Sequence, residues 1–197
     1  SDAGSPAVCD PGARLVAQVR AAGYKVSPVV GASAVIAALS VAGITAPDFV
    51  FAGFIPSKPS ERRTLLNAWQ NIHQTIVSYE TPHRIEATLA DMQAVFPERA
   101  VMLAREITKT FETIKKMTLA DLIQLIESDR NQQKGEIVLV IGGATQEKDL
   151  EQEKLDQLLT RLLQDLSVKA ASQLAADLTG IKKKVAYQRA LELTNKD

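Results

Sequence analysis

The fold of this 197-residue chain is decided by the segment that begins TIVSYETPHRIEATLADM at residues 75–92 and ends EIVLVI at residues 136–141. In the first stretch a β-branched strand pattern is followed by apolar residues at helical spacing. The same alternation of strand and helix recurs in residues 100–107 and 118–126. Strands that alternate with helices are typical of an α/β domain, and we expect an open mixed sheet. The nearly continuous apolar run at 136–141 suits the centre of that sheet.

Toward the N-terminus, two loops precede predicted helices. The chain opens with SDAGSPAVCDPG at residues 1–12, a turn-rich acidic loop whose glycines permit close backbone approach beside a helix N-terminus. On spacing alone, an ordinary turn is the more common interpretation. A strand is predicted at residues 24–30, and a second loop at 31–34 opens a helix of small residues. Because a loop of the first kind normally follows a strand, we expect residues 1–45 to be the remainder of an N-terminal α/β domain cut inside its boundaries.

The C-terminal quarter of the chain is expected to be a separate helical module. Residues 46–143 hold the α/β domain, and the polar stretch at 144–154 is predicted to be a linker. From 155 to 197 every pattern is helical, with leucines at positions 155, 158, 159, 162, 163 and 166. Ser167 is placed to cap the following helix and Gly180 to end it, which indicates a helix-turn-helix-like module.

Composition limits the classes of function. Lys plus Arg and Asp plus Glu number 23 each, so any basic site must be local. The triple lysine at 182–184 suits a nucleic-acid contact and an ordinary solvated helix face equally well. The single cysteine, Cys9, excludes an internal disulfide, and two histidines are too few for a multi-histidine metal site. No apolar run reaches the roughly 20 residues that span a bilayer. We therefore expect a soluble cytoplasmic protein without a metal.

Dense functional groups follow two of the predicted strands. They lie in YETPHR at residues 79–84 and AREITKTFE at residues 104–112. Ligands of open α/β sheets bind outside the carboxyl ends of strands, so we expect the two segments to share a pocket. Pairs such as Glu80 with Arg84 are also typical of structural ion pairs. Phosphate-loop, G-x-G-x-x-G, H-E-x-x-H and G-x-S-x-G motifs are absent, so these patterns alone do not identify a reaction.

Taken together and in order, the motifs resemble a known family. They are SDAGSPAVCDPG (1–12), VGASA (30–34), GFIP (53–56), YETPHR (79–84), AREITKTFE (104–112), GEIVLVI (135–141) and VKAASQLAADLTGIKKKVAYQRAL (168–191). This series resembles the ribosomal RNA small subunit methyltransferase I family, which methylates cytidine 2′-O-ribose in 16S rRNA. The resemblance implies the tetrapyrrole methylase fold, in which two α/β domains meet over S-adenosylmethionine without a G-x-G-x-x-G motif. The resemblance also implies an earlier loop of the cofactor cleft, so we expect this sequence to begin inside the cofactor domain.

The same resemblance implies which residues bind the cofactor and the RNA. S-adenosylmethionine would contact Asp2, Ala3, Gly4, Ser5, Val8, Ala32, Ser33, Ala34, Tyr79, Leu103, Ala104, Glu136 and Ile137. RNA would contact Lys58, Arg62, Arg63, Arg84, Lys182, Lys183 and Lys184. The partner would be 16S rRNA or the small ribosomal subunit, and the enzyme is expected to be a homodimer.

The chemistry of ribose methylation suggests roles for three more residues. A ribose hydroxyl has a pKa far above neutrality, so it must be held in line with the methyl group and helped to lose its proton. Glu106 is the best candidate for accepting or relaying that proton. Arg105 and Lys109 are expected to orient the RNA phosphates, with help from Arg84.

Two other functions stay open on the sequence. A tetrapyrrole methyltransferase would share the cleft, although a small tetrapyrrole needs no lysine-rich helical appendix. A non-catalytic RNA-binding module would need no cofactor. Because part of the cofactor domain is missing, we expect this chain to have little or no activity by itself.

Overall fold

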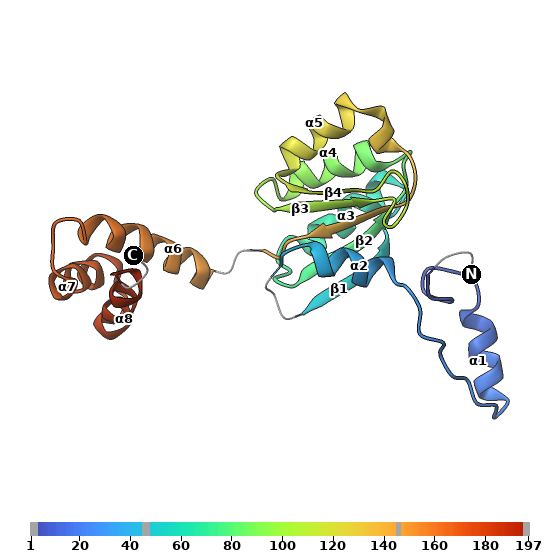
Figure 1. Ribbon diagram of the computed structural model, residues 1–197, viewed down its shortest axis with the longest axis horizontal. Coiled ribbons are helices and arrows are strands. Elements are labelled where there is room, and N and C mark those ends of the chain that lie inside the picture. The colour runs from blue at the N-terminus through green and yellow to red at the C-terminus, as the bar shows by residue number, and fades with distance from the viewer. Residues whose placement is uncertain (1–3, 45–47, 145–146, 195–197) are drawn as a thin grey trace. The chain divides into compact units, whose positions relative to one another are not determined.

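The structure, a computed structural model, describes residues 4–44, 48–144 and 147–194, which divide into two compact units at Ala144/Thr145 (Figure 1). The first unit contains helices α1 (Ala13–Ala21), α2 (Ala34–Val41), α3 (Pro59–Trp69), α4 (Ile85–Val95) and α5 (Leu119–Ser128), and a 3₁₀ helix η1 (Arg130–Gln133). Its strands are β1 (Phe49–Phe54), β2 (Thr75–Glu80), β3 (Val101–Arg105), β4 (Thr113–Met117) and β5 (Ile137–Ile141). The second unit contains α6 (Glu147–Leu162), α7 (Val168–Thr179) and α8 (Lys183–Thr194).

The five strands form one mixed sheet in the order β1-β2-β5-β3-β4. β1 and β2 are parallel, whereas β2–β5, β5–β3 and β3–β4 are antiparallel pairs. The open mixed sheet and the central place of β5 are therefore confirmed. Because β1, β2 and β3 run in one direction, their carboxyl ends lie beside the starts of β4 and β5, and we call this border of the sheet the site edge.

Helices cover both faces of the sheet. Strand residues alternate between the faces, so Leu103 and Leu139 belong to one cluster and Met102 and Val140 to the other. The first cluster packs against α3, α4 and α5, and the second packs against α2. The small residues of α2, such as Ala38, are what allow that helix to approach the sheet closely.

Several expected element boundaries need correction. The segment 24–30 is not a strand, and Val29 and Val30 are almost fully exposed, because none of the described strands pairs with it. The third strand ends at Arg105, since Glu106 has a positive φ of 51° that breaks the ladder. Helix α3 begins at Pro59, and residues 82–84 form a turn before α4.

Strand β4 was not expected from the sequence at all. Its sequence, TIKKM, places two exposed lysines in the middle of five residues. Lysines of this kind are common on edge strands, where they discourage pairing with other chains. The two lysines are the reason that the sequence pattern did not indicate this edge strand.

In the second unit, the predicted caps are confirmed and the predicted linker is wrong. Ser167 accepts a hydrogen bond from the Ala170 backbone N–H, and Gly180 ends α7 in the left-handed conformation. α6 begins at Glu147, so most of the stretch 144–154 is helical. Glu, Lys and Gln are good helix formers, and a polar composition does not distinguish an exposed helix from a linker. Leu155 and Leu159 pack against alanines of α7 and α8.

Candidate active site

The site edge brings together the two segments that the sequence singled out. Arg105, the last residue of β3, pairs with Ile137 on β5 and with Thr113 on β4. On the other side of β5, Ile137 pairs with Glu80 at the end of β2. The segments 79–84 and 104–112 therefore leave the sheet at the same edge, as expected.

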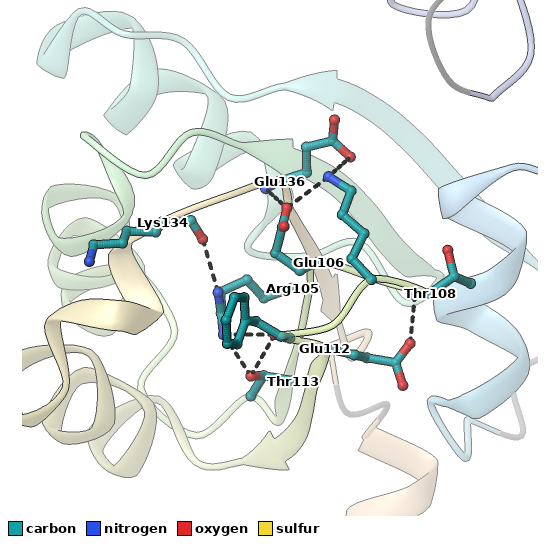
Figure 2. Close-up of polar contacts among 9 residues, drawn as sticks. Arg105, Glu106, Thr108, Glu112, Thr113, Lys134 and Glu136 are labelled. Atoms are coloured by element: carbon teal, nitrogen blue, oxygen red, sulfur yellow. Dashed lines mark hydrogen bonds and ion pairs between the residues drawn. The ribbon is translucent and has the colours of Figure 1, made fainter.

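A network of polar contacts fixes the loop after β3, residues 106–112 (Figure 2). The backbone N–H of Glu106 donates to the Glu136 carbonyl at 2.9 Å. In return, Oε1 of Glu106 accepts from the Glu136 N–H at 2.8 Å and from Lys109 Nζ at 2.9 Å. Lys109 also reaches Oε2 of Glu136 at 3.2 Å. The carboxylate of Glu106 thus joins its own loop to the start of β5.

Arg105 holds the far side of the same loop. Its side chain is 5% exposed, and Nη2 donates to the Phe111 carbonyl at 2.8 Å and to Thr113 Oγ1 at 3.0 Å. Nη1 reaches the Lys134 carbonyl (Figure 2). Nε reaches Gln132 Oε1. A guanidinium group with all these acceptors is not available to RNA phosphates. Its placement is that of a positioning residue, which differs from the expected phosphate contact.

Gly135 is a site residue that sequence reasoning missed. It has a positive φ of 81°, and a Cβ at this position would overlap the carboxylate of Glu106. Glycine is therefore required both by the backbone and by the close approach of Glu106. The only sequence signal is its place just before the strand run 136–141, which does not reveal the approaching side chain.

The contacts of Glu106 set its charge state. The hydrogen bond from the Glu136 backbone, followed by the contact with Lys109, lowers the pKa of Glu106 below its ordinary value. The contact with Glu106, and then that with Glu136, raises the pKa of Lys109. Both groups are therefore charged at neutral pH, and Glu106 is a weaker base than an ordinary glutamate.

The first loop, residues 4–12, reaches the same edge at the end of β1. Ser5 Oγ lies 3.5 Å from the Ala32 carbonyl, and Cys9 Sγ would lie 3.2 Å from a Cβ built on Gly53. The pKa of Tyr79 is raised by burial, then by the charges of Cys9 and Glu136, so Tyr79 lies near the first loop and the start of β5. The structure therefore brings the first loop, the second loop and the end of β2 together.

The other residues of the expected cofactor set differ in their exposure. Val8 is half exposed, whereas Leu103 and Ala104 are fully buried and offer no side chain to a ligand. Ser33 and Ala34 lie at the start of α2. Asp2 and Ala3 lie outside the described residues.

The residues expected to bind RNA fall into two groups. Lys58, Arg63 and the three lysines at 182–184 are exposed. Arg62 is 5% exposed and its Nε donates to Asp91 at 2.6 Å, so the expected RNA contact does not fit its placement. A buried arginine of this kind links α3 to α4. Sequence alone does not reveal this because the carboxylate partner lies 29 positions away.

Arg84 also has a partner inside the fold. It forms an ion pair at 2.8 Å with Glu80, a buried carboxylate that also accepts from Thr88 Oγ1 at 2.6 Å. Glu80 and Arg84 therefore form the structural ion pair that the sequence analysis gave as an alternative to a ligand site. Arg84 keeps a quarter of its side chain exposed.

None of the helices in residues 4–44, 48–144 and 147–194 is both long and apolar enough to cross a membrane. Over the same part of the chain, no three His, Cys, Asp or Glu side chains gather in a way that could hold a metal ion.

Comparison with known proteins places this geometry in a family. Residues 1–123 match the Tetrapyrrole (Corrin/Porphyrin) Methylases, and residues 149–194 match the RsmI C-terminal HTH domain. The Ribosomal RNA small subunit methyltransferase I of Neisseria meningitidis serogroup B (strain MC58) is 53% identical over 197 residues, which are 100% of this chain and 68% of that protein. The protein of the same name from Escherichia coli O157:H7 is 43% identical over 194 residues, 98% of this chain and 68% of its own length.

Solved structures agree on the fold. The methyltransferase CobJ superimposes with a TM-score of 0.53 at 22% identity, covering 72% of this chain and 62% of CobJ. Cobalt precorrin-4 methyltransferase, CbiF, gives 0.50 at 16% identity, covering 70% of this chain and 60% of CbiF. These likenesses concern the fold alone. The resemblance drawn from the motifs is confirmed, and the chain belongs to the ribosomal RNA small subunit methyltransferase I family, with the fold of the tetrapyrrole methylases.

Proposed function

We propose that this chain is the S-adenosylmethionine-dependent enzyme that methylates 16S rRNA in the small ribosomal subunit, at the 2′-hydroxyl of a cytidine ribose. Family membership supports the proposal. The structural observation that carries it is that the first loop, at Cys9, reaches Gly53 near the end of β1, on the same site edge that the loop after β3 leaves. Tyr79 is near both Cys9 and Glu136.

The residues at the site edge fit S-adenosylmethionine, which would supply a methyl group carried on a positively charged sulfur. Gly4, Ser5 and Ala32 leave backbone groups uncovered by large side chains, and they lie together. Val8 and Phe54, each about half exposed, offer apolar surface for an adenine ring. The rest of the proposed cofactor set is Asp2, Ala3, Ser33, Ala34, Tyr79, Leu103, Ala104, Glu136 and Ile137, in which the buried Leu103 and Ala104 would act through the backbone.

Glu106 is proposed to act on the ribose hydroxyl as a hydrogen-bond acceptor. The contacts that lower its pKa fall on Oε1, which leaves Oε2 as the atom facing a substrate. Because the carboxylate is a weak base, we assign most of its contribution to orienting the hydroxyl toward the methyl group. Lys109 keeps Glu106 ionised, and Arg105 keeps the loop in place.

The RNA itself is proposed to contact Lys58, Arg63, Arg84 and the lysines at 182–184. Cations of this kind bind the phosphate backbone without reading sequence. Ribosomal RNA as substrate places the activity in the cytoplasm, and the exposed free thiol of Cys9 fits a reducing compartment. We also propose that the enzyme acts as a homodimer, as the family resemblance implies.

The test is methyl transfer by the full-length protein from isotopically labelled S-adenosylmethionine to small ribosomal subunits. Digestion of the 16S rRNA and mass spectrometry of the nucleosides should show label in 2′-O-methylcytidine. The Glu106→Gln variant should transfer methyl groups roughly 100-fold more slowly, with cofactor affinity by calorimetry unchanged. Label in a base, or a wild-type rate for Glu106→Gln, would contradict the assignment.

The second candidate is a tetrapyrrole methyltransferase, which the fold neighbours favour. A porphyrin precursor offered in the same assay should accept no label if the proposal is right. A protein that binds rRNA but not S-adenosylmethionine would instead be a non-catalytic RNA-binding module.

A further inference from the structure

Phe111 is an exposed aromatic residue on the loop after β3. Its side chain is 73% exposed, although the loop around it is fixed. Single exposed apolar residues are common and need no explanation by themselves. What distinguishes Phe111 is that a buried arginine holds its backbone, because Arg105 Nη2 donates to its carbonyl at 2.8 Å.

The rest of the loop adds to this rigidity. Glu106 and Thr108 both have positive φ values, of 51° and 66°, which are uncommon for residues other than glycine. The Thr108 N–H donates to Glu112 Oε2 at 2.7 Å, and the Glu112 N–H donates to the Lys109 carbonyl at 3.1 Å. Strained backbone that several contacts hold in place is typical of functional sites. An aromatic side chain on such a loop loses little entropy when it binds a partner.

The chemistry around Phe111 suits a nucleic acid. Lys109 lies two residues before it in the chain and is half exposed, and exposed Lys115 lies on the strand that follows the loop. Exposed aromatic rings interleaved with cations are the combination by which proteins bind unpaired RNA, since every base offers a flat face for stacking and every linkage a phosphate. The loop also carries Glu106, the group proposed to meet the ribose.

We infer that Phe111 is a stacking platform for an unpaired nucleobase of the ribosomal RNA, at or next to the nucleotide whose ribose is methylated. This inference rests on the proposed function of the same edge. It assigns Phe111 the role of positioning the RNA and gives it no part in the proposed cofactor set.

The experiment measures the dissociation constant of the full-length protein for 16S rRNA, together with cofactor affinity by calorimetry. Phe111→Ala should weaken RNA binding about tenfold, since stacking on an aromatic side chain contributes on the order of a factor of 5 to 150 per base. Phe111→Tyr should bind as the wild type does. Phe111→Leu, which keeps apolar area without a ring face, should bind like Phe111→Ala. The matched control is Phe49→Ala, an exposed phenylalanine at the opposite end of β1 from the site edge, which should change nothing.

Three results would overturn the inference. RNA affinity could be the same in all Phe111 variants, or Phe111→Leu could bind as tightly as wild type, which would indicate a protein contact instead of stacking. Phe111→Ala could also lose cofactor affinity, which would place Phe111 in the cofactor site. Methyl transfer by the wild-type protein is recorded separately, so absence of transfer with intact RNA binding contradicts the proposed function while the Phe111 comparison still decides the inference.

Discussion

At the scale of single residues, the site depends on a glycine that makes room for a carboxylate. Gly135 has a positive φ, and any side chain there would overlap Glu106. We predict that Gly135→Ala lowers the free energy of unfolding by about 3 kcal/mol and abolishes most methyl transfer, because Glu106 must leave the start of β5. Gly23→Ala is the matched control, since Gly23 also has a positive φ but no atom within 4 Å of its added Cβ.

The control should cost only about 1 kcal/mol, the strain of a left-handed residue. Urea unfolding of the two variants, with methyl transfer measured alongside, makes the comparison. If both variants lost the same free energy of unfolding, the overlap with Glu106 would contribute nothing to the cost of Gly135→Ala.

Arg105 is the other residue on which the loop depends. A lysine could not serve the acceptors that its planar guanidinium reaches, which include the carbonyls of Phe111 and Lys134. We predict that Arg105→Lys slows methyl transfer at least tenfold and increases hydrogen exchange in residues 106–112, while cofactor affinity is kept. Arg20→Lys, at an exposed arginine in the last turn of α1, should leave both measurements unchanged. Slow exchange in the loop of Arg105→Lys would contradict the positioning role.

At the scale of elements, the contact between α3 and α4 contains a buried ion pair. Arg62, 6% exposed at its side chain, shares Asp91 with the exposed Arg63. We predict that Asp91→Asn lowers the free energy of unfolding by about 3 kcal/mol at pH 7, because it leaves Arg62 buried without its carboxylate. Glu61→Gln, which removes an exposed pair with Lys58, should cost less than about 1 kcal/mol.

The same pair predicts a dependence on pH. Burial alone would raise the pKa of Asp91, but hydrogen bonds from Arg62 and Arg63 outweigh it and lower the pKa on balance. The stability that ionised Asp91 contributes is therefore fully present above the ordinary aspartate pKa of about 3.9, and it is lost as pH falls through the lowered value. Urea titrations from pH 7 to pH 2 should show the difference between wild type and Asp91→Asn shrinking below about pH 4. A difference that is constant with pH would contradict this account.

How much the sequence could predict varied from element to element. The apolar run of β5 and the cap at Ser167, whose Oγ accepts from the Ala170 N–H, follow from local patterns and were predicted. Strand β4 was hidden by its lysines, and the expected strand at 24–30 failed because a strand needs a partner that its own sequence cannot supply. The burial of Arg62 depends on Asp91, and that of Arg105 depends in part on Gln132 and Lys134, all 27 to 29 positions away in the chain. Nothing in an arginine's own neighbourhood in the sequence reveals them.

At the scale of the whole molecule, the candidate site belongs to the first unit and the triple lysine to the second. Lys183 and Lys184 begin α8, where a positive charge opposes the helix dipole, so an anion would relieve their mutual repulsion. We predict that Lys183→Ala/Lys184→Ala reduces the slope of log K against log salt for 16S rRNA by about 1 to 2. Lys154→Ala/Lys169→Ala, at two exposed lysines of the same unit, should reduce it less. Equal slopes for the two double variants would make the cluster an ordinary solvated face.

We propose that loops from distant parts of the chain lie at one edge of the sheet to hold the methyl donor and the RNA. Hydrogen exchange of the full-length protein, followed by mass spectrometry with and without S-adenosylmethionine, distinguishes this arrangement from its alternatives. The cofactor should slow exchange in peptides that cover residues 4–9, 31–34 and 79–81, and added 16S rRNA should slow exchange in 106–112. Protection confined to the opposite edge of the sheet, at the depression lined by Glu98, Arg99, Ala100, Lys116, Met117 and Thr118, would contradict it.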